Sequence, residues 1–316
     1  MSQTTPTLHL GITMAGAVSA GAYTAGVMDY LFEALQKWET AKKKEAKLSK
    51  KKKKIPPHCV QIDVIGGASA GGITAALTAL TCFSGINPVT KLEPVKEKGD
   101  KPSNNLLFDT WVNLAGKKNM PEAIFRMLQT DDLDGMNGIP ALLNSKAIDD
   151  VAANAVNHVK SMPQSTWPAF VADDLEILLT LCSLRGIPVG IDFNSGNNTW
   201  TTGPSHQMAI HKQYARFTTD ENSVDTSRAM PVRLSIRETL ENFIHFAKAT
   251  AAFPIGLEAR QISLSRNHIK HQFGTFFGFD QKTLDKVFEE STVSDPFEFT
   301  SVDGGALNNE PFSEIA

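Results

Sequence analysis

The sequence predicts an α/β fold, and three stretches carry the prediction. Val60–Phe83 joins a β-branched run to a small, apolar run with helical character. Thr7–Trp38 repeats this order, with apolar residues at spacings of three and four after a loop of small residues. Phe297–Val302 is a late β-prone run that leads into Asp303. Units of this kind build one large α/β domain, for which 316 residues suffice.

The turn at 67–71 reads GASAG, the G-x-S-x-G pattern of a nucleophile elbow. Such an elbow needs Gly67 and Gly71 because the strand and the helix pass too close to each other for a Cβ atom. Ser69 is thereby expected at the carboxyl edge of the sheet, at a helix N-terminus that favours negative charge. A plain strand-to-helix turn is the alternative for the pentapeptide alone. A P-loop is disfavoured because no lysine follows, and the dinucleotide G-x-G-x-x-G pattern is absent.

The earlier loop, residues 14–21, reads MAGAVSAG and also joins a strand to a helix. Its backbone N–H groups lie at a helix N-terminus, where they can stabilise an anion. The alternative is a tight turn whose glycines only allow close packing. The helix after it is expected to start near Ala22 and to end before a run of lysines.

That run, Lys42–Lys54, holds nine lysines and one glutamate in a chain whose formal net charge is −3. Such a block is typical of a solvated loop. A sharper hypothesis is peripheral contact with an anionic membrane, where each lysine near the surface contributes about 1 kcal/mol. Nucleic acid is not expected as a partner, because the run lacks interleaved aromatic residues.

The remaining composition favours a cytoplasmic protein without a metal or another cofactor. The three cysteines are widely spaced, which predicts neither a disulfide framework nor a zinc site. The start of the chain lacks the basic residues of a signal peptide. Leu10–Met28 and Val64–Thr90 are uncharged, but their many small residues predict buried α/β core and not membrane spans.

The middle of the chain is expected to hold a helical insertion and then the rest of the sheet. Leu106–Met162 has helical spacing, including Ile139–Val159, and is interpreted as a cap over the site. The further expected elements are two strands at Leu175–Leu184 and Ile187–Phe193 joined by a tight turn, β structure at Trp200–Thr202 and Met208–Phe217, a helix at Ser235–Ala252 and a short helix at Leu284–Phe288.

Asp303 is the candidate partner of Ser69. It ends a strand and is followed by two glycines, which permit a sharp exit from the sheet. A turn-capping role is the alternative. Asp134 is not preceded by a strand, and Asp63 lies within one, so both are weaker candidates. No histidine follows Asp303, as a Ser-Asp-His order would require, and none of the eight histidines is assigned to catalysis.

These motifs together resemble the patatin-like phospholipase family. The resemblance rests on the glycine-containing loop 14–21, on DVIGGASAGG at 63–72, on Asp303-Gly304-Gly305 and on the alanine-rich Ala249–Pro254. It implies a three-layer α/β/α fold with a mainly parallel central sheet and inserted helices. It also implies hydrolysis of lipid acyl esters by a serine–aspartate dyad without histidine.

Carried onto this sequence, the resemblance makes Ser69 the nucleophile and Asp303 the base. It places Gly16 and Ala17 in the oxyanion loop, with Gly21 as the last glycine of that loop. The loop departs from the family pattern Gly-Gly-Gly-x-Arg/Lys-Gly, because it has no basic residue.

The expected function is therefore a serine acyl hydrolase acting on phospholipid or lysophospholipid, with a lipid acyl ester as its partner. A catalytically silent lipid-binding module and an acyltransferase using the same dyad are the alternatives. Asn309–Ala316 reads as the start of a further element, which indicates a piece of a longer protein.

Overall fold

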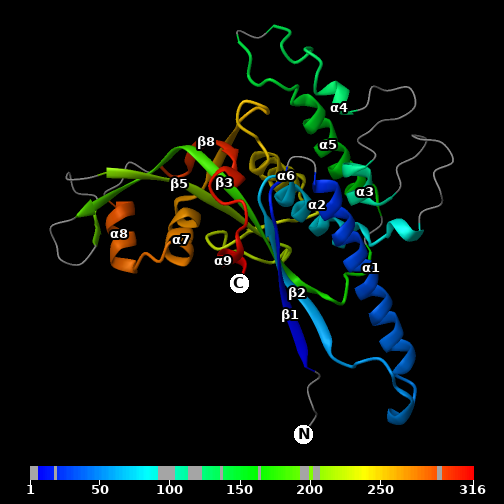
Figure 1. Ribbon diagram of the computed structural model, residues 1–316. Coiled ribbons are helices and arrows are strands. Elements are labelled where there is room, and N and C mark those ends of the chain that lie inside the picture. Colours follow the sequence, from blue (N-terminus) through cyan, green and yellow to red (C-terminus); the bar gives the residue numbers. More distant parts are fainter. Residues whose placement is uncertain are drawn as a thin grey trace.

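The computed structural model describes residues 6–17, 20–91, 104–112, 123–135, 138–162, 165–192, 199–201, 207–289 and 294–316 (Figure 1). Along the chain, the strands are β1 (Thr7–Met14), β2 (Cys59–Gly67), β3 (Val171–Asp192), β4 (Thr199–Thr201), β5 (Gln207–Thr218), β6 (Met230–Pro231), β7 (Arg260–Leu264) and β8 (Phe297–Asp303). The α-helices are α1 (Gly21–Glu45), α2 (Ala70–Ser84), α3 (Leu106–Trp111), α4 (Ala123–Arg126), α5 (Lys146–Ser161), α6 (Arg237–Thr250), α7 (Arg266–Phe276), α8 (Gln281–Glu289) and α9 (Phe312–Ile315).

The sheet is mixed, with a parallel core. Strands β1, β2 and β3 run parallel to one another, and β5 runs antiparallel to β3 on its other side. Strand β8 is antiparallel to β3, and β7 is antiparallel to β8. The expectation of an α/β fold with a mainly parallel core is confirmed.

Helices cover both faces of this sheet, as the alternation of side chains along β5 shows. Phe217 packs edge to face against Phe243 and Phe246 of α6. Tyr214 points to the other face, where its ring lies 4.9 Å from that of Phe276 in α7. Successive side chains of a strand point to opposite faces, so α6 and α7 form separate layers. The three-layer α/β/α arrangement is confirmed (Figure 1).

The long strand β3 aligns the ends of two other strands. Its residue Leu179 pairs with Gly67 at the end of β2, and Leu181 pairs with Asp303 at the end of β8. Because β5 occupies the opposite edge of β3, β2 and β8 share one edge and approach each other from opposite directions. Their carboxyl ends meet with only Thr180 between them. This arrangement places the elbow beside the turn that follows β8.

One strand replaces the expected pair of strands at 175–193. β3 continues from Val171 to Asp192, and its pairing with β5 shifts between Cys182 and Ile187. Gly186 adopts φ +67° there, in the left-handed region that glycine tolerates. The expected tight turn was therefore wrong: the glycine marks a bulge, and β5 pairs with β3 on both sides of it. Phe193 lies outside the described residues.

The expected loop at Lys42–Lys54 is partly helical. Helix α1 ends at Glu45 and includes the first three lysines, and Lys50–Lys52 forms a 3₁₀ turn. Lysine is a good helix former, and cations in the last turn of a helix are stabilised by its dipole. Lys42 also donates to Glu39 at 2.7 Å. The expectation that the helix ends before the lysines was wrong.

The insertion at 106–162 is helical only in parts. Helices α3, α4 and α5 lie within it, but α5 begins at Lys146, seven residues later than the expected start at Ile139. Pro140 and the polar pair before α5 disfavour an earlier start. Helices α3 and α5 pack beside α2 (Figure 1). Among the helices of the described residues, none is both long and apolar enough to cross a bilayer.

Candidate active site

Ser69 occupies a strained turn between β2 and α2. Its backbone has φ 52° and ψ −126°, in a region that residues other than glycine rarely adopt. Strain of this kind costs on the order of 1–3 kcal/mol and persists only where the surrounding structure enforces it. The side chain is half-buried, at the N-terminus of α2. The turn therefore presents a hydroxyl at a helix end that favours an anion.

Gly67 and Gly71 allow the end of β1 to pack directly on this turn. A Cβ atom on Gly71 would lie 2.2 Å from the carbonyl oxygen of Met14, and one on Gly67 would lie 2.4 Å from the same oxygen. Both distances are shorter than any non-bonded contact to carbon. The glycines of the turn are thus required mainly by close approach of the β1 backbone. The expected close passage of strand and helix is found at Gly67, where a Cβ atom would lie 2.7 Å from the backbone of Gly71.

Asp303 lies at the end of β8 within reach of Ser69. The Ser69 hydroxyl lies close enough to the Asp303 carboxylate to lower its pKa, and the N–H of Gly305 donates to the same side chain at 2.7 Å. Only 5% of Asp303 is exposed. Burial raises the pKa of Asp303 above its ordinary value, and the neighbouring serine hydroxyl and Gly305 N–H oppose this rise without cancelling it. The structure thus brings Ser69 and Asp303 together.

Gly16 lies against the serine, but its N–H group is already bonded. A Cβ atom on Gly16 would lie 2.9 Å from the Cβ atom of Ser69. The Gly16 N–H donates to the carbonyl oxygen of Asn309 at 3.2 Å, and the Asn309 amide donates back to the Gly16 carbonyl at 3.3 Å. Asn309 therefore ties the loop after β1 to the turn that carries Asp303. Sequence reasoning gave Asn309 no role.

The other loop residues differ in their surroundings. Ala17 follows Gly16 and is half-buried. Gly21 begins α1 and faces the indole of Trp111, where a Cβ atom would lie 2.2 Å from the ring. Close packing against Trp111 thus accounts for Gly21, whose nearest neighbours do not include Ser69.

Two further groups around Ser69 were missed in the sequence. The Ser69 N–H donates to the hydroxyl of Thr250 at 3.2 Å, and Thr250 is fully buried at the end of α6. Ala70 is the first residue of α2, a position whose N–H has no partner within the helix. The alanine-rich segment around Thr250 was the available signal, but nothing in its pattern pointed to a backbone contact with Ser69.

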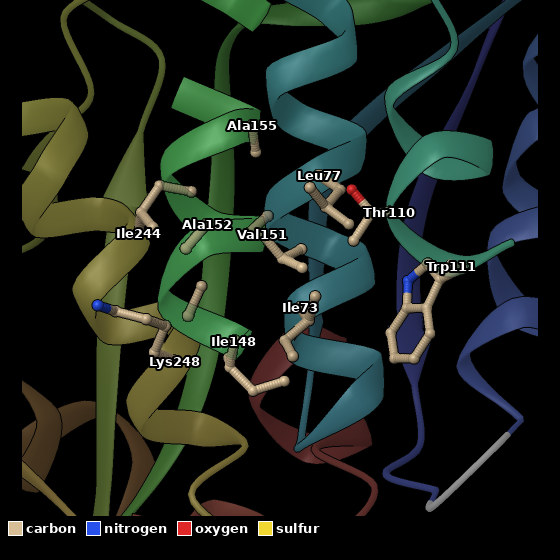
Figure 2. A pocket seen from close by; sticks show the side chains of 12 residues that line it. Ile73, Leu77, Thr110, Trp111, Ile148, Val151, Ala152, Ala155, Ile244 and Lys248 are labelled. Atoms are coloured by element: carbon tan, nitrogen blue, oxygen red, sulfur yellow. The ribbon is translucent and has the colours of Figure 1, made fainter. Parts of the chain in front are cut away.

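An apolar cavity of about 90 Å³ lies one helical turn beyond Ser69 (Figure 2). It is bounded by α2, α3, α5 and α6, and Ile73, four residues after Ser69, is part of its wall. The Lys248 side chain also lines it, but its ammonium group pairs with Asp149 at 2.8 Å. The cavity therefore presents hydrocarbon, which favours an apolar ligand group.

Four of the described histidines have surroundings away from Ser69 and Asp303. His268 is buried, and burial lowers its pKa to about 4. His211 contacts the carbonyl of Ser183, and His245 contacts the carbonyl of Gln261. His9 pairs with Asp63, one of the weaker carboxylate candidates. Within the described part of the chain, no histidine is bonded to Ser69 or Asp303. His206 lies outside it.

Comparison with known proteins agrees with this geometry. The family model described as patatin-like phospholipase matches residues 12–316. An uncharacterized protein of Sinorhizobium fredii, y4iI, is 31% identical over 337 aligned positions, which cover 98% of this chain and 45% of that protein. The chain thus spans less than half the length of this relative. Since the family match extends over nearly the whole sequence, the chain belongs to the patatin-like phospholipase family.

Proposed function

We propose that this chain is a serine hydrolase of lipid acyl esters, with Ser69 as nucleophile and Asp303 as general base. The observation that carries the proposal is the proximity of the Ser69 hydroxyl, on a strained elbow, to the buried carboxylate of Asp303. Family membership supports hydrolysis of lipid esters as the reaction class. A dyad is chemically sufficient, because a serine hydroxyl needs only one positioned base to become a nucleophile.

The reaction proceeds in two steps. The Asp303 carboxylate takes the Ser69 proton while Oγ forms a bond to the ester carbonyl carbon. The tetrahedral intermediate then expels the alcohol, which receives the proton from Asp303, and leaves an acyl group on Ser69. Water, deprotonated by Asp303, attacks this acyl-enzyme and releases the fatty acid. Asp303 gives the proton taken from water to the Ser69 oxygen as the bond between this oxygen and the acyl carbon breaks.

The oxyanion is stabilised by backbone N–H groups at the start of α2 and in the loop after β1. We assign the N–H of Ala70 as one donor, because the residue after an elbow nucleophile commonly fills this role. Ala17 is the candidate second donor. Gly16 can contribute only if its N–H leaves the Asn309 carbonyl. Each donor of this kind contributes about 10²–10³ in rate.

The apolar lining of the cavity favours hydrocarbon, such as part of an acyl chain, as the group next to the scissile carbonyl. Ile73 and Leu77 follow each other along α2, and Ile148 and Ile244 face them from α5 and α6 (Figure 2). An acyl chain in this cavity would run along α2 away from Ser69. We therefore propose phospholipids or lysophospholipids as substrates.

The lysine-rich segment Lys42–Lys54 is a second feature that could meet a membrane. It lies before the start of β2, whereas Ser69 follows the end of that strand (Figure 1). The nine residues of β2 separate them by on the order of 25 Å. Peripheral contact of these lysines with anionic lipid would thus leave Ser69 at the far end of the sheet.

The proposal is tested by fatty-acid release from a panel of phospholipids and lysophospholipids, with Ser69→Ala as the matched control. We expect release by the unaltered protein and none by the variant. A fluorophosphonate probe should also form an adduct with the unaltered protein only. Absence of both release and adduct in folded protein would favour the silent lipid-binding module. Formation of a new ester with an added alcohol would favour an acyltransferase.

Thr250 is expected to position the nucleophile. Thr250→Val keeps the shape of the side chain but leaves the Ser69 N–H without its acceptor. An unsatisfied buried donor costs about 1–3 kcal/mol, so kcat/KM should fall about 5- to 100-fold. Thr250→Ser keeps the hydroxyl and should retain most of the activity. Equal loss in both variants would contradict this role.

The pH dependence should reveal the raised pKa of Asp303. Because the base must be ionised, kcat/KM should fall with decreasing pH through a pKa above 3.8, the ordinary value of this carboxyl. A raised folded-state pKa means that protonation of Asp303 stabilises the fold, so this group does not drive unfolding in the same interval. Far-UV circular dichroism should therefore stay constant where activity falls. An acid limb at or below 3.8 would contradict the assignment.

A further inference from the structure

Six large apolar side chains are exposed at the end of the molecule where β2 and β8 meet. Their exposed fractions lie between 56% and 76%, and we call them the apolar platform: Phe125, Leu128, Ile139, Leu142, Phe253 and Ile255. Single exposed apolar residues are common on proteins. A group of them on one surface instead marks an interaction site.

Backbone hydrogen bonds hold the three segments of the platform side by side. The N–H of Leu142 donates to the carbonyl of Ile255 at 2.8 Å, and that of Leu143 donates to Gly256 at 3.0 Å. The N–H of Asn144 donates to the carbonyl of Met127 at 2.8 Å. Segments 125–128 and 253–256 are therefore both bonded to segment 139–144, which brings the six exposed side chains into one region of the molecule.

The platform is continuous with the candidate active site. Phe253 follows Ala252, whose carbonyl accepts the N–H of Asp303 at 2.9 Å. Helix α5 follows segment 139–144, and α6 precedes segment 253–256. Both helices also line the apolar cavity (Figure 2). The platform thus adjoins the backbone that carries Asp303 and the helices that line the cavity.

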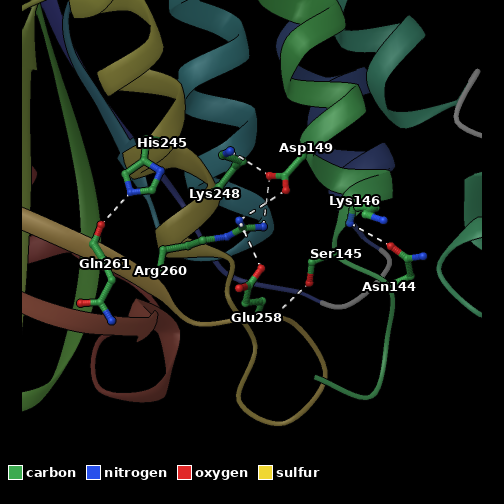
Figure 3. A network of polar contacts seen from close by, with 9 residues as sticks. All are labelled: Asn144, Ser145, Lys146, Asp149, His245, Lys248, Glu258, Arg260 and Gln261. Carbon is green, nitrogen blue, oxygen red and sulfur yellow. Dashed lines mark hydrogen bonds and ion pairs between the residues drawn. The ribbon is translucent and has the colours of Figure 1, made fainter. Parts of the chain in front are cut away.

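A polar network joins the segments that follow the platform residues on either side (Figure 3). Asp149 accepts from Lys248 at 2.8 Å and pairs with Arg260 at 3.1 Å. The N–H of Glu258 donates to the Ser145 hydroxyl at 2.9 Å. Three residues before Glu258, Ile255 adopts φ +70°, a conformation that strains a β-branched residue. The fold thus maintains a strained backbone that leaves Ile255 76% exposed.

The charges around the platform do not add up to a basic surface. Each cation in the described segments next to the platform has an acidic partner: Arg126 with Asp150, Lys146 with Asp131, Lys248 with Asp149, and Arg260 with Asp149 and Glu258. Asp132 and Asp134 add negative charge on the adjoining turn. Such a surface gains little from anionic headgroups, so the apolar side chains must supply the attraction.

We propose that the apolar platform inserts into the surface of a zwitterionic lipid bilayer and holds the candidate active site against it. The inference rests on the proposed function for its substrate class, since a lipid ester reaches the site from a lipid phase. Attraction by hydrocarbon burial predicts binding that needs no anionic lipid and changes little with salt. This behaviour differs from that expected of docking through Lys42–Lys54.

The test measures sedimentation with phosphatidylcholine vesicles in a Ser69→Ala background, so that binding is separated from turnover. We compare this protein with one that also carries Leu142→Gln and Ile255→Asn. Asparagine tolerates the left-handed conformation, so the change at 255 should not destabilise the fold. Removing two apolar side chains should weaken partitioning at least about tenfold. The melting temperature checks the fold of each variant.

The matched control is Val224→Asn, because Val224 is 90% exposed and lies on the loop between β5 and β6. That loop contacts His268 of α7, on the opposite face of the sheet from α6. The control should bind like the parent.

Equal loss in the control and the platform variant would overturn the proposal, as would lack of binding to neutral vesicles. Binding that needs anionic lipid and disappears with glutamine at Lys51–Lys54 would assign the contact to the lysine run instead. Hydrolysis of a water-soluble ester by the unaltered protein tests the proposed function separately.

Discussion

Asp303→Asn is expected to lower kcat for ester hydrolysis by about 10²–10⁴-fold, the contribution of a positioned general base. Asparagine has nearly the same shape and can still accept the N–H of Gly305, but it cannot take the Ser69 proton. Burial raises the pKa of Asp303, so at pH values above that pKa the ionised side chain lowers the stability of the folded state. At neutral pH the melting temperature of the variant should therefore equal or exceed that of the parent.

The matched control for this prediction is Asp63→Asn. Asp63 lies on β2, six residues before Ser69, and its carboxylate pairs with His9 at 2.7 Å. The Asp63→Asn variant should keep kcat within about twofold of the parent value, because exposed ion pairs of this kind contribute little. Retained turnover in Asp303→Asn would assign proton abstraction to another group. Comparable losses in both variants would point to a general electrostatic effect.

Gly71→Ala is expected to destabilise the protein by about 3 kcal/mol, the upper range for overpacking. Its Cβ atom would lie 2.2 Å from the Met14 carbonyl oxygen and 2.6 Å from that of Ala15, and a backbone cannot yield as a side-chain end can. Any relief moves the loop after β1 away from Ser69, so activity should fall in the protein that remains folded. Urea unfolding and ester turnover measure the two effects.

Gly26→Ala is the control for this substitution. Gly26 lies on the exposed side of α1, and a Cβ atom there would meet nothing within 4 Å. Alanine in a helix interior is favoured over glycine by about 0.5–1 kcal/mol, so this variant should be more stable than the parent. A Gly71→Ala protein as stable and active as the parent would show that β1 does not restrict the elbow as described.

Local patterns were enough to predict the elements closest to Ser69. β2 and α2 match their expected stretches, because glycines at fixed offsets from a serine report a steric requirement that the sequence shows directly. Asp303 was recognisable from a strand followed by two glycines. The reason for glycine directly after Asp303 became visible only in the structure: a Cβ atom on Gly304 would lie 2.2 Å from the backbone of Thr180 in β3.

Features that depend on distant contacts were not predictable. β7 and α7 received no prediction, although Ser265 caps α7 by accepting from the N–H of His268. The contact of Thr250 with Ser69 joins residues 181 positions apart, and no local pattern encodes such a pair. The same holds for Asn309, whose carbonyl occupies the N–H of Gly16. The apolar platform also combines segments that are short and unremarkable when read separately.

Mass spectrometry of the acyl-enzyme tests the central claim most directly. The protein is mixed with a p-nitrophenyl ester of a fatty acid, quenched in acid within the first turnovers, digested and analysed by peptide mass. The account predicts one acyl group on the peptide that contains Ser69 and none in the Ser69→Ala protein. Turnover accompanied by an acyl group on another residue, or by no acylated peptide at all, would contradict it.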